Sequence, residues 1–240
     1  MALDSGSLER IIPALLEHEG ATGAPTLELH LMRYKFAAEH IQPGRVLDIA
    51  CGVGYGTKVL SASRFIKEAI GVDISADATE YAQSQYGNDG IKFVTADALE
   101  FTDSFGFENI VSLETIEHVP DPRALLGHLT SLLKSGGILI GSVPITPSVD
   151  ANPHHRTDFT AYSFRKIACA FGLVELDSLC QDQSYDPVAI LRGKEKRSSG
   201  IRRNIPAYYL ANPDRLWARI YSTLQYGFRN RYLTIVWRKH

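Results

Sequence analysis

The chain has 240 residues, of which 45% are hydrophobic and 22% charged, values that are ordinary for a globular protein. This composition excludes a disordered tail, a collagen-like fibre and a disulfide-rich scaffold, and the length suits one large domain or two small ones. With 25 basic and 27 acidic residues, the net charge of −2 argues against a global attraction to nucleic acid. The 3 cysteines have no metal-ligand spacing and fit a reducing compartment.

The N-terminal region carries charged residues within its first twenty positions, so it lacks the apolar centre of a signal peptide. No stretch approaches the roughly 18 consecutive apolar residues of a membrane span. We therefore expect a cytoplasmic protein without a membrane span. Helical periodicity over 5–20 and 26–41 predicts two helices before the core.

Short apolar runs alternate with polar, helix-like stretches from Arg45 onward. The runs predict strands at 45–50, 69–74, 91–96, 109–114 and 137–144, and the stretches predict helices at 57–68, 75–87 and 121–134. This alternation is typical of an α/β fold with a doubly wound parallel sheet. The remaining elements are expected as a helix over 161–171, strands over 172–179 and 232–237, and a helical, aromatic stretch over 212–228.

A glycine-rich segment, DIACGVGYG at 48–56, joins the first predicted strand to the next helix. Glycines permit tight turns and close approach of a ligand, and the free N–H groups of a helix start can bind an anion. The segment alone also fits an ordinary strand–helix turn. A dinucleotide site would require Gly or Ala where Thr57 stands. Asp48 would repel a phosphate, but it would suit a ligand that carries an ammonium or a sulfonium.

Two further acidic residues, Asp73 and Asp97, end the next two predicted strands. A carboxylate at Asp73 can accept both hydroxyls of a ribose, Asp97 can accept from an exocyclic amine, and Ala98 leaves room for a flat base. Each acid by itself could be a helix cap. Acids at the ends of three consecutive strands, with Asp48, instead indicate a ligand at the carboxyl edge of the sheet.

Five motifs in chain order resemble those of class I S-adenosylmethionine-dependent methyltransferases: VLDIACGVGYGT, GVDIS, FVTADALEF, NIVSLETIEHV and LLKSGGILIGSVP, covering roughly residues 43–145. The sequence is similar to type 11/12 methyltransferases, among them ubiquinone-pathway O-methyltransferases and bacterial sugar-associated enzymes. The resemblance implies a seven-stranded, mostly parallel Rossmann-like sheet whose last strand is antiparallel, with S-adenosylmethionine as cofactor. It also implies cofactor contacts at Arg33, Asp48, Ala50, Gly52, Gly54, Tyr55, Asp73, Ile74, Asp97, Ala98, Leu113 and Glu114.

A candidate metal site follows the fourth predicted strand, where helical spacing would place Glu114, Glu117 and His118 on one side. Two carboxylates and an imidazole suit a cation such as Mg²⁺. In the ubiquinone-pathway and small-RNA 2′-O-methyltransferases, which this string resembles, the corresponding residues bind a divalent metal. In the RNA enzymes a further histidine completes the set, and His155 matches it better than His154. Without a metal, His118 or His155 would be the general base, and packing or capping is the alternative role for the string.

The flanks of the predicted core suggest three units: N-terminal helices at 1–42 that cover the cofactor site, a core at 43–181 and 231–240, and an insertion at 182–230 that carries acceptor specificity. By resemblance, Arg33 pairs with the cofactor carboxylate; a surface role is the alternative. The basic stretch at 192–203 fits either a phosphate contact or a solvated face. The aromatic residues of the insertion favour packing over ligand stacking.

These features predict an S-adenosylmethionine-dependent O-methyltransferase acting on a small hydroxylated acceptor, first a sugar, glycoside or nucleotide-sugar, then a phenolic ring. Glu117, His118 and His155 are the candidate catalytic residues, and Glu114, Glu117, His118 and His155 the candidate Mg²⁺ ligands. The alternatives are an RNA 2′-O-methyltransferase, a metal-independent N-methyltransferase, and a dinucleotide-dependent oxidoreductase or non-catalytic nucleotide-binding module. The oligomeric state stays open, a homodimer included.

Overall fold

The computed structural model describes residues 23–184 and 204–240, with side chains from residue 26 onward. The predicted helix over 5–20 and the basic stretch over 192–203 lie outside these residues. No helix within the described residues is long and apolar enough to cross a bilayer.

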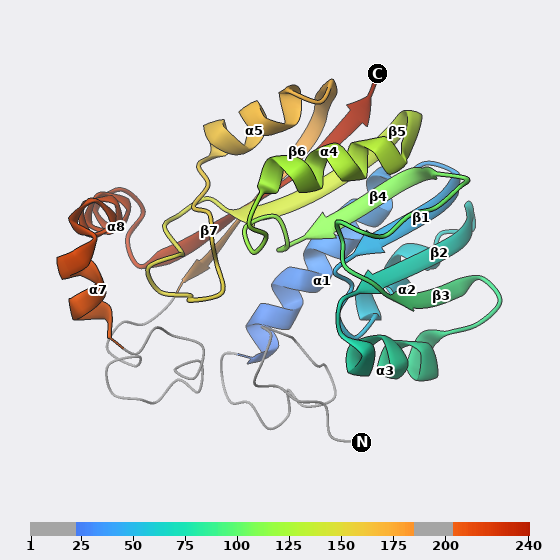
Figure 1. Cartoon of the computed structure of the whole chain (residues 1–240), viewed down its shortest axis with the longest axis horizontal. Coiled ribbons are helices and arrows are strands. Elements are labelled where there is room, and N and C mark those ends of the chain that lie inside the picture. The colour runs from blue at the N-terminus through green and yellow to red at the C-terminus, as the bar shows by residue number, and fades with distance from the viewer. Residues whose placement is uncertain (1–22, 185–203) are drawn as a thin grey trace.

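Seven strands of the described chain form one sheet in the order β3-β2-β1-β4-β5-β7-β6 (Figure 1). Their bounds are β1 (Gly44–Ile49), β2 (Ile66–Asp73), β3 (Ile91–Thr95), β4 (Phe107–Leu113), β5 (Leu133–Pro144), β6 (Leu173–Ser184) and β7 (Arg229–Lys239). Strand β7 runs antiparallel to β5 and β6, whereas the other pairs are parallel. The predicted doubly wound α/β fold with an antiparallel last strand is confirmed.

Helices cover both faces of this sheet (Figure 1). Their bounds are α1 (Gly23–His40), α2 (Tyr55–Ser61), α3 (Ala76–Tyr86), α4 (Pro122–Leu132), α5 (Ala161–Cys169), α7 (Ile205–Ala211) and α8 (Pro213–Tyr226). Successive strand residues point to opposite faces, so Leu47 joins the apolar core under α4 and α5, whereas Val46 joins the core under α1 and α2. Two cores, one on each face, hold the sheet.

Two predicted elements differ in length from those observed. The helix predicted over 57–68 ends at Ser61, because the chain from Ile66 already pairs with the start of β1 at Gly44. The strand predicted over 172–179 continues to Ser184, because Ser184 pairs with Arg229, the first residue of β7. In both cases pairing with a distant strand sets the boundary, and local periodicity does not contain that information.

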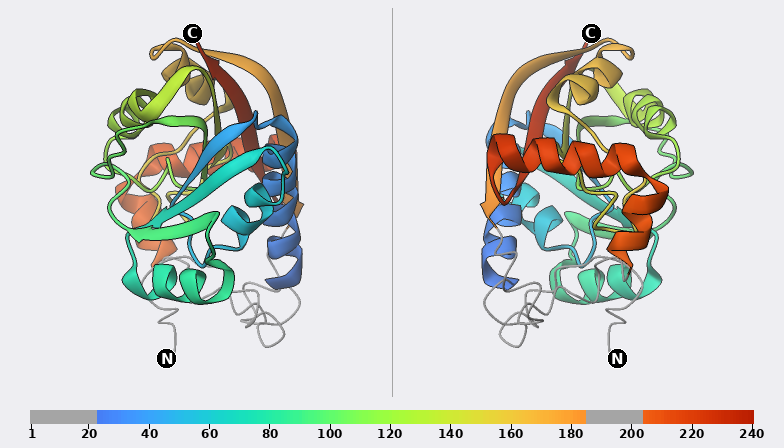
Figure 2. Two further views of the ribbon diagram at one scale, coloured as in Figure 1. Left: turned by 90° about the vertical axis from the view of Figure 1, so that its right-hand side faces the viewer. Right: turned by 90° about the vertical axis from the view of Figure 1, so that its left-hand side faces the viewer.

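The candidate site residues from the sequence lie at the carboxyl edge of the parallel strands. Beyond it lie α7, α8 and the loop between β5 and α5 (Figure 1). Figure 2 shows α8 running across this edge. Parallel α/β sheets bind ligands outside the carboxyl ends of their strands, so the site is built here.

Candidate active site

Asp48 supports the glycine loop from inside the protein. Its side chain is fully buried, and its carboxylate accepts hydrogen bonds from the Thr57 hydroxyl at 2.6 Å and the Tyr34 hydroxyl at 3.2 Å. Burial raises the pKa of Asp48 to about 7; the hydrogen bonds from Thr57 and Tyr34 oppose this rise, and the charge of Asp73 adds to it. Thr57 stands where a dinucleotide-binding motif has Gly or Ala. Its hydrogen bond to Asp48 joins the start of α2 to the end of β1 and so stabilises the glycine loop between them.

Glycine is required at each of the three loop positions for a different physical reason. Gly52 adopts φ 56°, and a Cβ placed on it would meet no atom within 4 Å, so the space beside it is open. Gly54 adopts φ 85°, and its Cβ would lie 2.6 Å from the Cβ of Ala82. At Gly56 a Cβ would lie 1.9 Å from the ring of Tyr34. The loop is therefore open to a ligand at Gly52 and closely packed at Gly54 and Gly56.

Asp73 is the last residue of β2, and Asp97 lies two residues beyond the end of β3. One oxygen of Asp73 accepts from the Gly52 N–H and the other from the Ser75 N–H, both at 2.9 Å. Asp97 is half-buried and accepts from the Leu99 N–H at 2.8 Å. These bonds fix both carboxylates in place and leave each oxygen with further acceptor capacity.

The apolar and aromatic candidates around the loop differ in exposure. Ile74 is 61% exposed directly after Asp73, whereas Leu113 is buried at the end of β4. Ala98 is half-buried. Tyr55, at the start of α2, packs edge-on against Tyr34, and burial raises its pKa. An exposed isoleucine at a strand end leaves an apolar surface for a flat ring.

Arg33 lies inside the protein, with 1% of its side chain exposed. Its Nε donates to Gln181 at 2.7 Å, its Nη1 lies 3.4 Å from Glu114 Oε1, and the guanidinium stacks on Tyr232 at 4.3 Å from the ring centre. Among the described residues no acceptor makes a hydrogen bond to Nη1. A buried guanidinium N–H without an acceptor is costly, so this group fits a carboxylate supplied by a ligand.

Glu114 is held in a strained conformation beside Arg33. Together with Ala50 it is one of the two non-glycine residues of positive φ in the described chain, at 52° and 58°, and both follow directly on a strand of the sheet. The Ser142 hydroxyl accepts from the Glu114 N–H at 3.0 Å and donates to its carboxylate at 2.8 Å. The carboxylate of Glu114 is thereby directed to Ser142 and Arg33.

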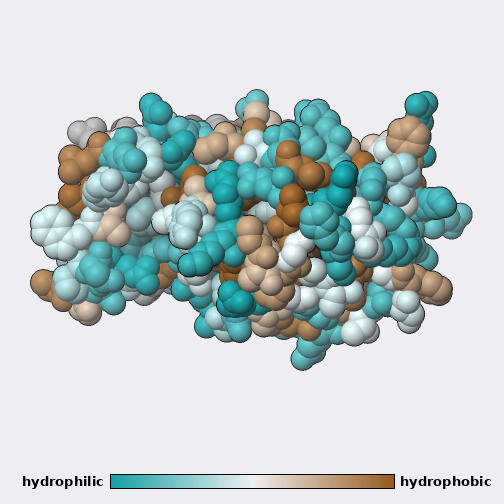
Figure 3. All heavy atoms as spheres, turned by 90° about the horizontal axis from the view of Figure 1, so that it is seen from above, coloured by the Kyte–Doolittle hydropathy of each residue, from teal (hydrophilic) through white to brown (hydrophobic). Residues whose placement is uncertain are grey.

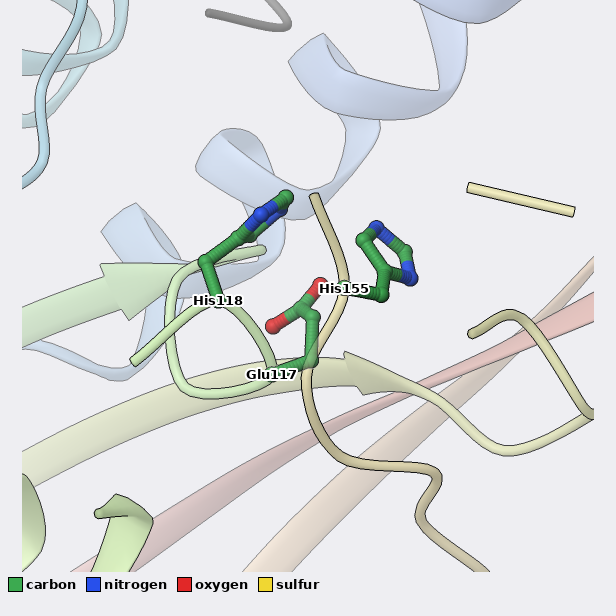
Figure 4. Close-up of side chains that lie close together, drawn as sticks. All are labelled: Glu117, His118 and His155. Atoms are coloured by element: carbon green, nitrogen blue, oxygen red, sulfur yellow. The ribbon is translucent and has the colours of Figure 1, made fainter. Parts of the chain in front are cut away.

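The other three predicted metal ligands come together in a cluster of Glu117, His118 and His155 (Figure 4). One ligand atom from each lies within 4.8 Å of the others, and the two imidazole rings meet edge-on with centres 4.5 Å apart. Glu117 is fully buried, and its carbonyl accepts from Arg156 N at 2.8 Å. That bond ties the loop that carries His155 to the turn after β4.

The hydrogen bonds of the two histidines hold their rings in place. Nδ1 of His118 lies 3.2 Å from the carbonyl oxygen of His154, which can only accept, so Nδ1 carries the proton. In the neutral ring of His118 the lone pair is then on Nε2, as a base or a metal ligand requires. Nδ1 of His155 lies 2.8 Å from the Ser148 hydroxyl, which also lies 3.3 Å from Asp158 Oδ1 and can either donate to the ring or accept from it.

Comparison with known proteins agrees with this arrangement. The family model described as a methyltransferase domain matches residues 28–190. An uncharacterized methyltransferase of Mycobacterium tuberculosis is 32% identical over 117 residues, which are 48% of this chain and 58% of that relative. The chain belongs to the class I S-adenosylmethionine-dependent methyltransferases.

Two further methyltransferases place the chain within a broad family. The ubiquinone biosynthesis O-methyltransferase of Methylococcus capsulatus is 28% identical over 117 residues, 46% of this chain and 48% of that relative. The N-methyltransferase NodS of Bradyrhizobium japonicum, solved with S-adenosylhomocysteine, superposes with a TM-score of 0.59 at 16% identity, covering 94% of this chain and 97% of that chain. Both sequence alignments span less than two thirds of the curated relative. The family model establishes the family, and these relatives leave the acceptor open.

Sequence reasoning missed the contacts that attach α7 and α8 to this methyltransferase core. Asp150, 1% exposed, accepts from Arg219 Nε at 2.8 Å and from the Tyr209 hydroxyl at 2.5 Å. Burial alone would raise the pKa of Asp150, but the Arg219 guanidinium holds it below its usual value. Arg215 pairs with Asp158 in the same loop. These partners are 57 to 69 residues apart, so no local pattern announces them.

Proposed function

We propose that the protein transfers a methyl group from S-adenosylmethionine to a hydroxyl of a small molecule, with a sugar or glycoside as the first acceptor class to test. One observation carries the proposal: the buried Glu117 lies together with His118 and His155 just after Glu114, the partner of Arg33, and β4, which precedes this turn, pairs with β1, which precedes the glycine loop. The similarity to an enzyme named as an O-methyltransferase supports transfer to oxygen.

The cofactor side of this proposal rests on groups that fit a methionine and a nucleoside. Arg33 Nη1 would receive the methionine carboxylate, and the open space at Gly52 would admit the backbone approach of the ligand. Asp73 would accept the ribose hydroxyls, with Ile74, Asp97 and Ala98 around the base. S-adenosylmethionine supplies the methyl group from its sulfonium.

The acceptor side must make a hydroxyl nucleophilic. Nε2 of His155 or His118 would take the hydroxyl proton, and Glu117 would stabilise the resulting imidazolium. The His154 carbonyl keeps the His118 ring in the tautomer this requires, and the Ser148 hydroxyl holds the His155 ring in place. Correct placement of the hydroxyl in line with the methyl group supplies much of the remaining acceleration.

The same three side chains would also hold a divalent cation, which would lower the pKa of a bound hydroxyl. With Glu114 directed to Arg33, the set contains two imidazole nitrogens and one carboxylate. That set suits Mn²⁺, Fe²⁺ or Zn²⁺ better than Mg²⁺, which prefers oxygen ligands. The Mg²⁺ predicted from the sequence therefore fits these three side chains less well than the other divalent cations do.

The test is an incubation with methyl-labelled S-adenosylmethionine and sugars, glycosides, phenols, amines or RNA, each with and without EDTA. The proposal expects label in a hydroxylated small molecule, lost in His155→Ala and kept in the neighbouring control His154→Ala. Loss with EDTA and recovery with Mn²⁺ supports the cation; EDTA-resistant transfer leaves His155 as the base. Label that enters only an amine or only RNA contradicts the proposal.

A further inference from the structure

A fully buried cation is a more informative feature of a protein than an exposed apolar side chain. Trp217, Tyr221 and Leu224, on the outward apolar face of α8, are 69%, 68% and 82% exposed, and Figure 3 shows hydrophobic residues among hydrophilic ones over the whole face that it draws. Arginine, by contrast, is almost never fully buried unless it is paired. Arg33 is buried, so the side chains around its guanidinium need a physical reason.

Two neighbouring residues of β6 and β7 hold the guanidinium of Arg33. Gln181 and Tyr232 lie opposite each other in the ladder between these strands. The amide oxygen of Gln181 accepts from Arg33 Nε at 2.7 Å, and the guanidinium carbon lies over the Tyr232 ring. Gln181 is itself buried, and its amide nitrogen donates to the Leu29 carbonyl of α1 at 3.3 Å. Both polar atoms of the Gln181 side chain therefore fix α1 and its arginine against β6 and β7.

The partner that Gln181 supplies is neutral, and this decides what else Arg33 can bind. Arg33 Nη1 makes no hydrogen bond to an acceptor among the described residues. Glu114 Oε1 lies 3.4 Å from it and accepts from the Ser142 hydroxyl at the shorter distance of 2.8 Å. A carboxylate in place of the Gln181 amide could engage two N–H groups of the guanidinium and neutralise its charge. Glutamine instead fixes the direction of the guanidinium and leaves its charge for another anion.

We propose that Gln181 is a positioning residue for cofactor binding, which directs Arg33 to the carboxylate of S-adenosylmethionine and, being neutral, does not compete with that carboxylate. This inference rests on the cofactor side of the proposed function, in which Arg33 receives the methionine carboxylate. Because Gln181 acts through Arg33, its replacement changes the affinity for ligands that carry the carboxylate and leaves the affinity for ligands without it unchanged.

A purely structural role, the attachment of α1 to the sheet, is the competing explanation, and Gln183 supplies the comparison. Gln183 lies two residues further along β6 and thus on the same face. Its amide nitrogen donates to the Thr26 hydroxyl of α1 at 3.0 Å, and its amide oxygen accepts from the Tyr232 hydroxyl at 3.2 Å. Replacement of Gln183 therefore measures the effect of loosening α1, and the difference between the two positions measures the effect on Arg33.

The experiment is a calorimetric titration of the whole chain with S-adenosylhomocysteine and, separately, with 5′-methylthioadenosine, which keeps the adenosine and the sulfur but lacks the amino-acid part. Gln181→Glu should weaken binding of S-adenosylhomocysteine by about tenfold or more, because its carboxylate pairs with Arg33 and repels that of the ligand. Gln181→Met should weaken it less, because the guanidinium keeps its charge and loses only its direction. Binding of 5′-methylthioadenosine should be unchanged in both variants, and Gln183→Met should bind both ligands as wild type does.

Equal affinity of Gln181→Glu and wild type for S-adenosylhomocysteine overturns the inference, because a carboxylate can still accept from Arg33 Nε and a structural role would be preserved. An equal loss for both ligands overturns it too, since loosening of α1 alone would give that result, and so does an equal loss in Gln183→Met and Gln181→Met. These outcomes leave methyl transfer from S-adenosylmethionine untouched. Wild-type protein that does not bind S-adenosylhomocysteine overturns both the inference and the proposed function.

Discussion

The cofactor side and the acceptor side of the site are built in different ways. On the cofactor side, the Thr57 hydroxyl donates to Asp48 and the Gly52 N–H donates to Asp73, and all four residues lie within 48–73. On the acceptor side, the loop after β5 carries His155 and is fixed by ion pairs to α8, from the far end of the chain. Local sequence therefore determines the first, and tertiary contacts determine the second.

Because the two sides are held separately, their sequences can change separately within a family. A family can keep one cofactor site while the segment between β6 and β7 changes, because few of the cofactor-side bonds depend on that segment. Arg33 Nε bonds to Gln181, which lies within β6 and thus before that segment. The two sides should thus respond separately to substitution, and four variants test how completely they do so.

The largest expected effect separates catalysis from cofactor binding. Glu117→Gln keeps the shape of a fully buried side chain but removes its charge, so turnover should fall by about a thousandfold. Affinity for S-adenosylhomocysteine, measured by calorimetry, should stay close to wild type. The exposed Glu100→Gln is the control. An active Glu117→Gln enzyme would show that the cluster does not act on the acceptor.

The next effect concerns the attachment of α8. Asp150→Asn leaves Arg219, 17% exposed, without its carboxylate, which should cost about 3 kcal/mol. Hydrogen exchange should rise over 205–226 and stay unchanged around the glycine loop. Glu175→Gln, which breaks the exposed pair with Arg165, should cost no more than about 1 kcal/mol. Equal protection of residues 205–226 from hydrogen exchange in wild type and Asp150→Asn would show that the ion pair does not attach α7 and α8.

A third effect uses the raised pKa of Asp48, about 7 in the folded protein. Because the folded state binds this proton more tightly than the unfolded state, ionisation of Asp48 makes stability fall as pH rises from about 4 to 7. Asp48→Asn lacks this loss. From pH 5 to pH 8 the variant should therefore gain roughly 2–3 kcal/mol relative to wild type in urea unfolding. If the difference in unfolding free energy between variant and wild type does not change with pH, the pKa of Asp48 is not raised in the folded protein.

The smallest of the four effects concerns Arg33. Replacement by methionine keeps much of the packing on Tyr232 and removes the charge, so affinity for S-adenosylhomocysteine should fall about thirtyfold, close to 2 kcal/mol. Affinity for S-adenosylhomocysteine in Arg165→Met, which removes a half-buried surface cation, should be unchanged. If both variants bind alike, Arg33 only supports Glu114 and the sheet edge.

Much of the fold could be predicted from the sequence, because alternating apolar runs and turn residues express it locally. The glycine loop and Asp73 are marked by local sequence in the same way. His118 and His155 were singled out by a resemblance to metal-dependent methyltransferases, and the structure brings them together while their role stays a prediction. The direction of the Glu114 carboxylate could not, because it depends on Ser142 from the neighbouring strand and on Arg33 from α1. The outward apolar face of α8 was equally hidden, because an amphipathic pattern does not state which side faces the core.

The most direct test of the central claim is a calorimetric titration of the wild-type protein with S-adenosylhomocysteine and, separately, with NAD. The account predicts one site for S-adenosylhomocysteine, with a dissociation constant on the order of micromolar, and no heat from NAD. Binding of NAD at this edge, or no binding of S-adenosylhomocysteine, would contradict it.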